Sequence, residues 1–127
     1  MRTDDIPWDA HLAWYQRQLT RSDGSLLIGV EGDQPVGVAR FDVSGGEAVI
    51  TIAVAPDSRG RGVGRSLIGL VTAAALARPD VRIAVAYTRP DNLASQRAFL
   101  NNQYLQVGSA DLAGVTMVRF QKSKRGP

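Results

Sequence analysis

The sequence predicts an α/β (α+β) fold, in which helices pack on a mixed β-sheet. Two observations lead to this prediction. Apolar runs of strand length are bounded by turn residues, and longer segments with helical spacing of apolar residues are interleaved with them. A chain of 127 residues, 44% hydrophobic and 21% charged, has the size and composition of one globular domain. We therefore expect a single domain over residues 1–127.

The N-terminal region, residues 1–24, is expected to contain an amphipathic helix. Trp8, Leu12, Tyr15 and Leu19 follow one another at steps of four, three and four residues, which is the spacing of one helix face. A Ser-Asp-Gly turn then ends this helix.

A meander of three strands is expected next, at 26–30, 36–43 and 47–54, because turn residues separate these apolar runs. The third strand has apolar residues on both faces, which predicts a central strand covered on both sides. A helix at 65–77 and a strand at 81–87 follow, with Pro79 in the connection between them.

The C-terminal part is expected to hold one more helix and two closing strands. The helix, at 89–103, begins at a cap formed by Asp91 or Asn92. The strands lie at 104–108 and 115–121. The core of the domain thus spans residues 25–121, and a basic, solvated tail follows at 122–127.

Composition excludes several classes of site. The chain has no cysteine and a single histidine, so neither a disulfide framework nor a metal site is expected. No apolar run approaches the ~18 residues of a membrane span, and the first residues lack the apolar centre of a signal peptide. We expect a cytoplasmic protein without a membrane partner. The net charge of +3 owes much to the tail, so the arginines within the chain are a local feature.

One bend combines three glycines with three arginines, in the stretch Arg59-Gly60-Arg61-Gly62-Val63-Gly64-Arg65. It lies between an expected strand and an expected helix, where the first helical N–H groups have no partner in the helix. Such an end binds anions, and glycines allow phosphate oxygens to approach the backbone. The residues alone also fit a tight solvated turn or an arginine-glycine nucleic-acid binder. A P-loop is excluded, because no lysine followed by Ser or Thr closes the stretch.

The bend, preceded by Val54-Ala55-Pro56, is similar to the acetyl-CoA signature of the GCN5-related N-acetyltransferases. The family's second signature resembles Asn92 followed by Phe99 seven residues later, with Tyr104 after the helix. The resemblance covers roughly residues 25–121. It implies a GNAT-type mixed, mostly antiparallel sheet flanked by helices, with an acetyl-CoA slot between two splayed central strands.

The resemblance also implies how coenzyme A is held. Backbone amides of residues 60–65 would bind its diphosphate, and the pantetheine arm would pair with the strand end at 52–54. The implied cofactor-binding residues are Ile52, Ala53, Val54, Arg59, Gly60, Arg61, Gly62, Val63, Gly64, Arg65, Asn92, Ser95 and Phe99.

The implied activity is transfer of acetyl from acetyl-CoA to a primary amine of a small molecule, such as an amino sugar, or of a protein. The family often has a tyrosine acid where this chain has Phe99, so Ser95, Tyr87 or water is expected to protonate the leaving thiolate. Glu47 is either the base or a solvated carboxylate at a strand end.

The acceptor is expected beside the first helix and the meander. His11 and Trp14 would line its pocket, although helix packing also explains His11. Arg40 and Asp42 share one strand face and either line the same pocket or form a surface ion pair. The stretch His-Leu-Ala-Trp-Tyr resembles the early helix of acetyltransferases that act on amino sugars.

The family usually begins with a strand and a helix that we do not find in this sequence. The sheet is therefore expected to lack its first strand, and a second copy would cover the edge in a homodimer. The missing tyrosine and the short N-terminal region leave one alternative, a non-catalytic acyl-CoA-binding sensor or regulatory module of the same fold. No nucleic-acid partner is expected.

Overall fold

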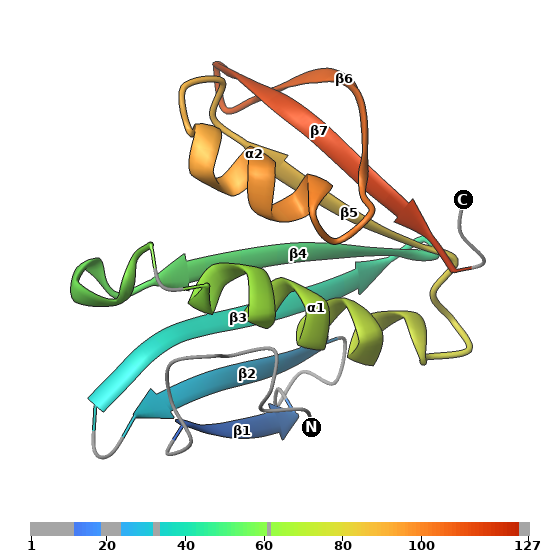
Figure 1. Cartoon of the computed structure of the whole chain (residues 1–127). Coiled ribbons are helices and arrows are strands. Elements are labelled where there is room, and N and C mark those ends of the chain that lie inside the picture. Colours follow the sequence, from blue (N-terminus) through green and yellow to red (C-terminus); the bar gives the residue numbers. More distant parts are fainter. Residues whose placement is uncertain (1–11, 19–23, 32–33, 61, 125–127) are drawn as a thin grey trace.

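A computed structural model describes residues 12–18, 24–31, 34–60 and 62–124 of the chain. These residues form one seven-stranded sheet in the order β1-β2-β3-β4-β5-β7-β6, with two α-helices and a short 3-10 turn (Figure 1). The elements are β1 (Leu12–Gln18), β2 (Gly24–Glu31), β3 (Gln34–Ser44), β4 (Glu47–Val54), η1 (Pro56–Ser58), α1 (Val63–Leu76), β5 (Ile83–Thr88), α2 (Leu93–Leu100), β6 (Leu105–Leu112) and β7 (Val115–Ser123).

The sheet is antiparallel everywhere except between β4 and β5, which run parallel. Parallel neighbours need a crossover connection, and α1 supplies it. Their register covers only Glu47–Ile50 against Ile83–Ala86. Beyond these pairs the two strands diverge towards their carboxyl ends, as Figure 1 shows. The predicted splay of the central strands is confirmed, and we call this opening the fork.

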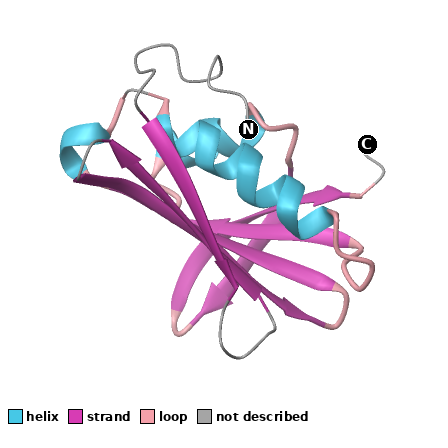
Figure 2. Cartoon of the chain, turned by 90° about the horizontal axis from the view of Figure 1, so that it is seen from below, coloured by secondary structure: helices cyan, strands magenta, loops and turns pink. Residues whose placement is uncertain are grey.

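Both helices lie on one side of the sheet, which we call the helix face (Figure 2). α1 buries Leu67, Ile68 and Val71 in the core. A close approach to β3 is possible because residue 37 is glycine: a Cβ there would lie 2.6 Å from Leu67 Cδ1. The strands contribute small and branched side chains beneath α1, whereas α2, the residue before β6 and β7 bring the rings of Phe99, Tyr104 and Phe120 together. The main core residues of the strands and α2 are Ala39, Phe41, Ala48, Ile50, Ala84, Ala86, Phe99 and Phe120.

The helix expected in residues 1–24 is wrong for the part that the structure describes. Residues 12–18 form β1, which pairs antiparallel with β2 from Leu12 opposite Glu31 to Gln18 opposite Ser25. The four-residue apolar pattern carried no information on this pairing, and contacts across the sheet override a local periodicity. The expected absence of a first strand is wrong as well, because β1 covers the edge of β2 that was the reason for a homodimer.

The expected cover on both faces of the central strand is also wrong over the described residues. β4 is central in the sheet, and its Ala48 and Ile50 are buried on the helix face. On the opposite face, Thr51 and Ala53 are exposed within the part of the chain that the structure covers. The remaining predicted elements are confirmed in type and order, and the strand at 47–54 has the predicted bounds.

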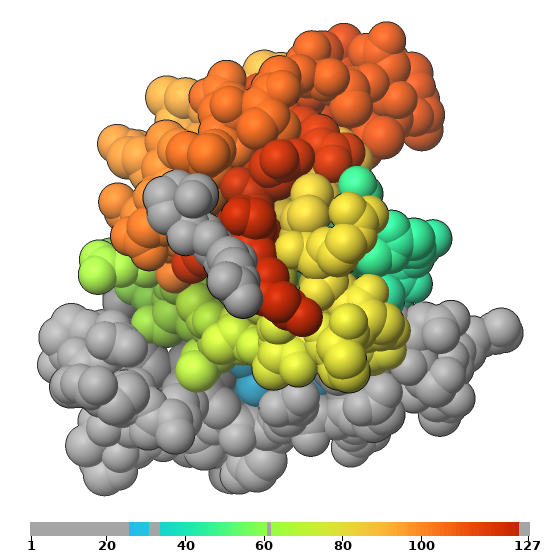
Figure 3. All heavy atoms as spheres, turned by 90° about the vertical axis from the view of Figure 1, so that its right-hand side faces the viewer, coloured from blue at the N-terminus to red at the C-terminus, as the bar shows by residue number. Residues whose placement is uncertain are grey.

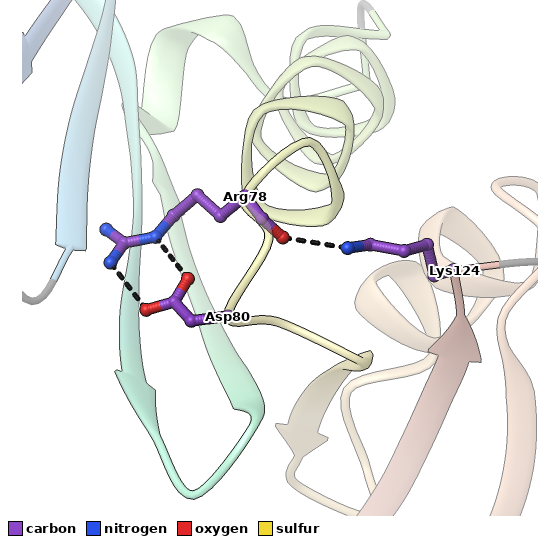
Figure 4. Close-up of polar contacts among 3 residues, drawn as sticks. All are labelled: Arg78, Asp80 and Lys124. Carbon is purple, nitrogen blue, oxygen red and sulfur yellow. Dashed lines mark hydrogen bonds and ion pairs between the residues drawn. The ribbon is translucent and has the colours of Figure 1, made fainter.

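The beginning of the predicted basic tail is part of the fold. Lys122 belongs to β7 and donates to the carbonyl of Asn102 at 2.9 Å. Lys124 donates to the carbonyl of Arg78, just after α1, at 2.8 Å, and Arg78 holds Asp80 through two hydrogen bonds of 2.9 and 2.8 Å (Figure 4). Figure 3 shows the red end of β7 against the yellow segment after α1. A cation at these carbonyls stabilises the helix C-terminus.

Among the described residues, no helix combines the length and apolar character that crossing a membrane requires.

Candidate functional site

The corner between β4 and α1 presents backbone N–H groups to open space. Gly62 is the N-cap of α1 at φ 83°, a left-handed conformation that favours glycine. The first helical hydrogen bond runs from Ser66 N to Gly62 O at 3.1 Å, so the N–H groups of residues 63–65 have no acceptor within the helix. A Cβ at Gly60 or Gly62 would meet nothing within 4 Å. A Cβ at either glycine would therefore meet no described residue beyond its chain neighbours.

The first turn of α1 rests on the end of β4. A Cβ at Gly64 would lie 3.4 Å from Val54 Cγ2 and 3.8 Å from Ile52 Cδ1. Arg59 lies beside this contact, and its Nε donates to the Val54 carbonyl at 3.4 Å. Arg65 is exposed in the first turn of α1, whereas Arg61 lies outside the described residues. Arg59 and Arg65 thus lie on either side of the start of α1 in the chain, and their part in cofactor binding stays a prediction.

Inside the fork, the end of β4 has backbone groups without a strand opposite. Ala55 N donates to Val36 O in β3 at 2.9 Å, so in the alternating antiparallel ladder residues 53 and 55 face β3. The N–H and C=O groups of Ile52 and Val54 consequently point towards β5, where the register has already ended at Ile50. This segment is a strand edge inside the sheet.

The other side of the fork consists of the end of β5 and the start of α2. Asn92 caps α2, since its Oδ1 accepts from Ser95 N at 3.1 Å, which decides between the two expected caps. Ser95 is half-buried in the first turn. Thr88, the last residue of β5, is only 4% exposed, and its Oγ1 has no hydrogen-bond partner among the described residues.

Phe99 belongs to the core and is only 2% exposed. Its ring lies 5.0 Å from that of Tyr104 in an edge-on arrangement and 5.9 Å from that of Phe120 in a stacked one. Burial raises the pKa of Tyr104 to about 12, although a hydrogen bond with Thr72 at 2.6 Å opposes the shift. This cluster positions α2 beside the fork.

On the sheet face opposite the helices, Arg119 joins two of the predicted catalytic residues. Its Nη1 donates to Tyr87 Oη at 2.9 Å, its Nη2 lies 3.4 Å from Glu47 Oε2, and its Cζ is 5.7 Å from the centre of the Tyr87 ring. Tyr87 is the first residue of β5 beyond the paired segment, whereas Glu47 lies at its paired end. Glu47 therefore has an ion-pair partner. It also lies about 13 Å along β4 from Thr51, the first residue of that strand beyond the paired segment.

The structure describes three of the four predicted acceptor residues. Arg40 and Asp42 form an ion pair at 2.8 Å on the face opposite the helices, where each is about half exposed. Their hydrogen bond raises the pKa of the Arg40 guanidinium. Trp14 lies in β1 rather than in a helix, and His11 lies outside the described residues. The helical wall expected for the acceptor is thus absent at residues 12–18.

Two residues near the fork were not singled out from the sequence. Thr88 was missed because the strand was expected to end one residue earlier, at 87. Arg119 was missed because it lies in the last strand, and only the register of β5 with β7 places it opposite Tyr87. The alternation of β5 was the one signal that could have indicated Thr88.

A comparison with family models matches residues 1–102 to the acetyltransferase (GNAT) family. The chain belongs to the GNAT family of acetyltransferases. Membership of this family classes the chain with the acetyltransferases and confirms the predicted resemblance and fold. A sequence search of curated proteins found no match.

Several solved GNAT structures share the fold of this acetyltransferase. The aminoglycoside acetyltransferase AAC(6')-Ib in complex with coenzyme A is 16% identical, with a TM-score of 0.71 over 81% of this chain and 68% of that one. Spermidine N-acetyltransferase from Vibrio cholerae, in complex with CoA and spermine, is 12% identical with a TM-score of 0.72 over 84% and 70%. The ribosomal-protein alpha-N-acetyltransferase RimL, in complex with coenzyme A, is 19% identical with a TM-score of 0.71 over 81% and 63%. The GNAT chain spans about two thirds of the length of these proteins.

Proposed function

We propose that this GNAT chain binds acetyl-CoA along the fork and transfers its acetyl group to a primary amine. One observation carries the proposal: the pairing of β4 with β5 ends at Ile50 and Ala86, and the first N–H groups of α1, which have no acceptor within the helix, follow the end of the same β4 strand. The first turn of α1 contacts that strand end, since a Cβ at Gly64 would lie 3.4 Å from Val54 Cγ2.

The corner would hold the diphosphate. The N–H groups of residues 63–65 have no acceptor within the helix, and Gly60 and Gly62 present no side chain beside them. Arg59 and Arg65 are exposed beside them and can add charge-assisted hydrogen bonds, and we assign the same role to Arg61.

The strand edge would hold the pantetheine arm. The backbone groups of Ile52 and Val54 point into the fork, so an extended amide-containing arm can pair with them as an added strand does. The bond from Arg59 to the Val54 carbonyl is long at 3.4 Å and is easily exchanged for a better one. Across the fork, Asn92 uses its Oδ1 in the helix cap and keeps its amide NH₂ group to donate to the arm.

The chemistry asks little of the protein beyond placement. A neutral amine attacks the acetyl carbon, the C–N bond forms as the C–S bond breaks, and a backbone N–H of the β4 edge near Val54 that the arm leaves unpaired would donate to the oxyanion. Ser95 lies in the first turn of α2 and Tyr87 next to the end of β5, and we propose that one of their hydroxyls exchanges a proton in the fork. The ion pair of Glu47 with Arg119 supports a structural role for Glu47 rather than that of the base.

We propose a small molecule with a primary amine, such as an amino sugar, as the acceptor. The solved GNAT structures that share this fold include enzymes for an aminoglycoside and for spermidine, and also one for a protein N-terminus. The burial of Phe99 in an aromatic cluster, where the family often has an acid, favours a second candidate, a non-catalytic acyl-CoA-binding module.

Two measurements separate these functions. Calorimetry with coenzyme A is expected to show binding, and an amine panel of amino sugars, polyamines and peptides is expected to release free thiol with one class. Binding without thiol release from any amine would favour the module, whereas no binding by folded protein would overturn both functions. The homodimer stays a prediction, which light scattering tests.

A further inference from the structure

Thr88 occupies a defined place in the fork. It pairs with Val118 of β7 at the end of β5, and the strand alternation puts its side chain on the helix face, with those of Ala84 and Ala86. Continuing the register of β4 and β5 by two residues would bring it opposite Ile52. Thr88 is therefore the first helix-face side chain of β5 beyond the last pair.

The hydroxyl of Thr88 is buried without a partner. The residue is 4% exposed, and Oγ1 makes no hydrogen bond to any described residue. Thr72, which is buried to a similar extent, shares its hydroxyl with Tyr104 at 2.6 Å. A buried hydroxyl without a partner destabilises the folded chain, and valine would fill the same volume without this penalty. A bound ligand that hydrogen-bonds with the hydroxyl would explain why a threonine is found at this position.

Register and chain order place Thr88 at the end of the fork where the pairing has stopped. Ile52 would lie opposite it in a continued register, and the capped start of α2 at Asn92 follows four residues later. At Phe99 there is no hydroxyl, and the ring is enclosed by Tyr104 and Phe120. Thr88 thus supplies a hydrogen-bonding side chain on the side of the fork from which the family's acid is missing.

We propose that Thr88 Oγ donates a hydrogen bond to the sulfur atom of coenzyme A in the fork, an inference that rests on the proposed function. When the amine nitrogen bonds to the acetyl carbon, the C–S electron pair stays on sulfur, and the amine's proton passes to Ser95, Tyr87 or solvent and then to the thiolate. Thr88 keeps its own proton, because an aliphatic hydroxyl is a much weaker acid than a thiol. Its hydrogen bond becomes stronger as negative charge develops on sulfur.

Two matched variants test the assignment: Thr88→Val removes the hydroxyl at constant volume, and Thr88→Ser keeps it. Calorimetry with coenzyme A and with desulfo-coenzyme A, which lacks the sulfur, gives a readout that is independent of turnover. We expect Thr88→Val to bind coenzyme A about 2- to 10-fold more weakly than the wild type and desulfo-coenzyme A equally well. Turnover is expected to fall about 10- to 100-fold, because a bond to a charged atom contributes more. Thr88→Ser is expected to keep both properties.

Thermal unfolding without ligand distinguishes this role from a structural one. Thr88→Val is expected to melt at or above the temperature of the wild type, because it removes an unpaired hydroxyl. Wild-type binding and turnover in Thr88→Val would overturn the inference alone, and so would an equal loss of affinity for both ligands. A wild type that binds neither ligand would overturn the proposed function as well. If Thr88→Val melts early, Thr88→Ala is compared with Thr88→Ser by the same criteria.

Discussion

The open corner makes Gly62→Glu the most direct test of where the diphosphate binds. At φ 83° a residue with a Cβ is strained by about 1–2 kcal/mol, and beyond the chain neighbours no described atom lies within 4 Å of the new Cβ to add a clash. We therefore expect a folded protein with a melting temperature lowered by roughly 3–8 °C. Gly114 offers a matched control, because it has φ 81°, equally open space and a place in the turn between β6 and β7.

The loss of affinity follows from the charge. Two unit charges about 4 Å apart repel by ~1 kcal/mol in water and by ~4 kcal/mol at an effective dielectric constant of about 20. A glutamate at position 62, set against a single phosphate charge, is thus expected to weaken coenzyme A binding between about fivefold and about a thousandfold.

Calorimetry with coenzyme A, on both variants and at two salt concentrations, measures this effect. Gly114→Glu is expected to lose the same stability and none of the affinity, and the deficit of Gly62→Glu is expected to shrink at high salt. Wild-type affinity in a folded Gly62→Glu variant, or an equal loss in both variants, would refute the assignment of the corner as the diphosphate site.

Three further outcomes test the packing around the fork. In urea unfolding, Tyr104→Phe and Thr72→Val are each expected to lower the free energy of unfolding by about 1–3 kcal/mol, because each leaves one buried hydroxyl unpaired. The double variant is expected to lose less than the sum of the two, and additive losses would contradict a shared hydrogen bond. The folded chain keeps the Tyr104 proton to about pH 12, whereas the unfolded chain loses it near 10.0, so the unfolding free energy is expected to fall as the pH rises through this window. Denaturation curves of Tyr104→Phe should lack that slope, and an unchanged slope would assign it to other groups. Arg119→Met is expected to lower the free energy of unfolding by about 1 kcal/mol, because it leaves Tyr87 and Glu47 without their shared partner. Arg119→Lys is expected to lower it less. Equal stability of Arg119→Met and the wild type in the same assay would show that the contacts contribute nothing.

Much of the fold could be predicted because its local signals agree with the tertiary structure. β4 was predicted to the residue, since turn residues bound a run that is apolar on both faces. The helix after it follows from the glycines and the periodicity of α1, and Asn92 follows from its capping chemistry. The fork and the acetyl donor were predicted from the resemblance of two short motifs, at residues 59–64 and 92–99, to those of the GNAT family.

The parts that could not be predicted depend on contacts between distant segments. Residues 12–18 form β1 through pairing with β2, which no spacing within the segment indicates. Arg119 reaches Tyr87 only through the register of β7 with β5. The orphan hydroxyl of Thr88 depends on three-dimensional burial, and a strand pattern alone cannot reveal it.

The short parallel register has a mechanical consequence for this GNAT chain. Strands β1 to β4 and strands β5, β7 and β6 are joined within the sheet only by the pairs from Glu47–Ile83 to Ile50–Ala86. Helix α1 also connects the two parts of the sheet, because it contacts β2, β3 and β4 on one side of the fork and β5 on the other. Acetyl-CoA bound in the fork would pair with the part of β4 that β5 leaves unpaired. The two parts of the sheet would then be held together more rigidly with the ligand bound than after product release.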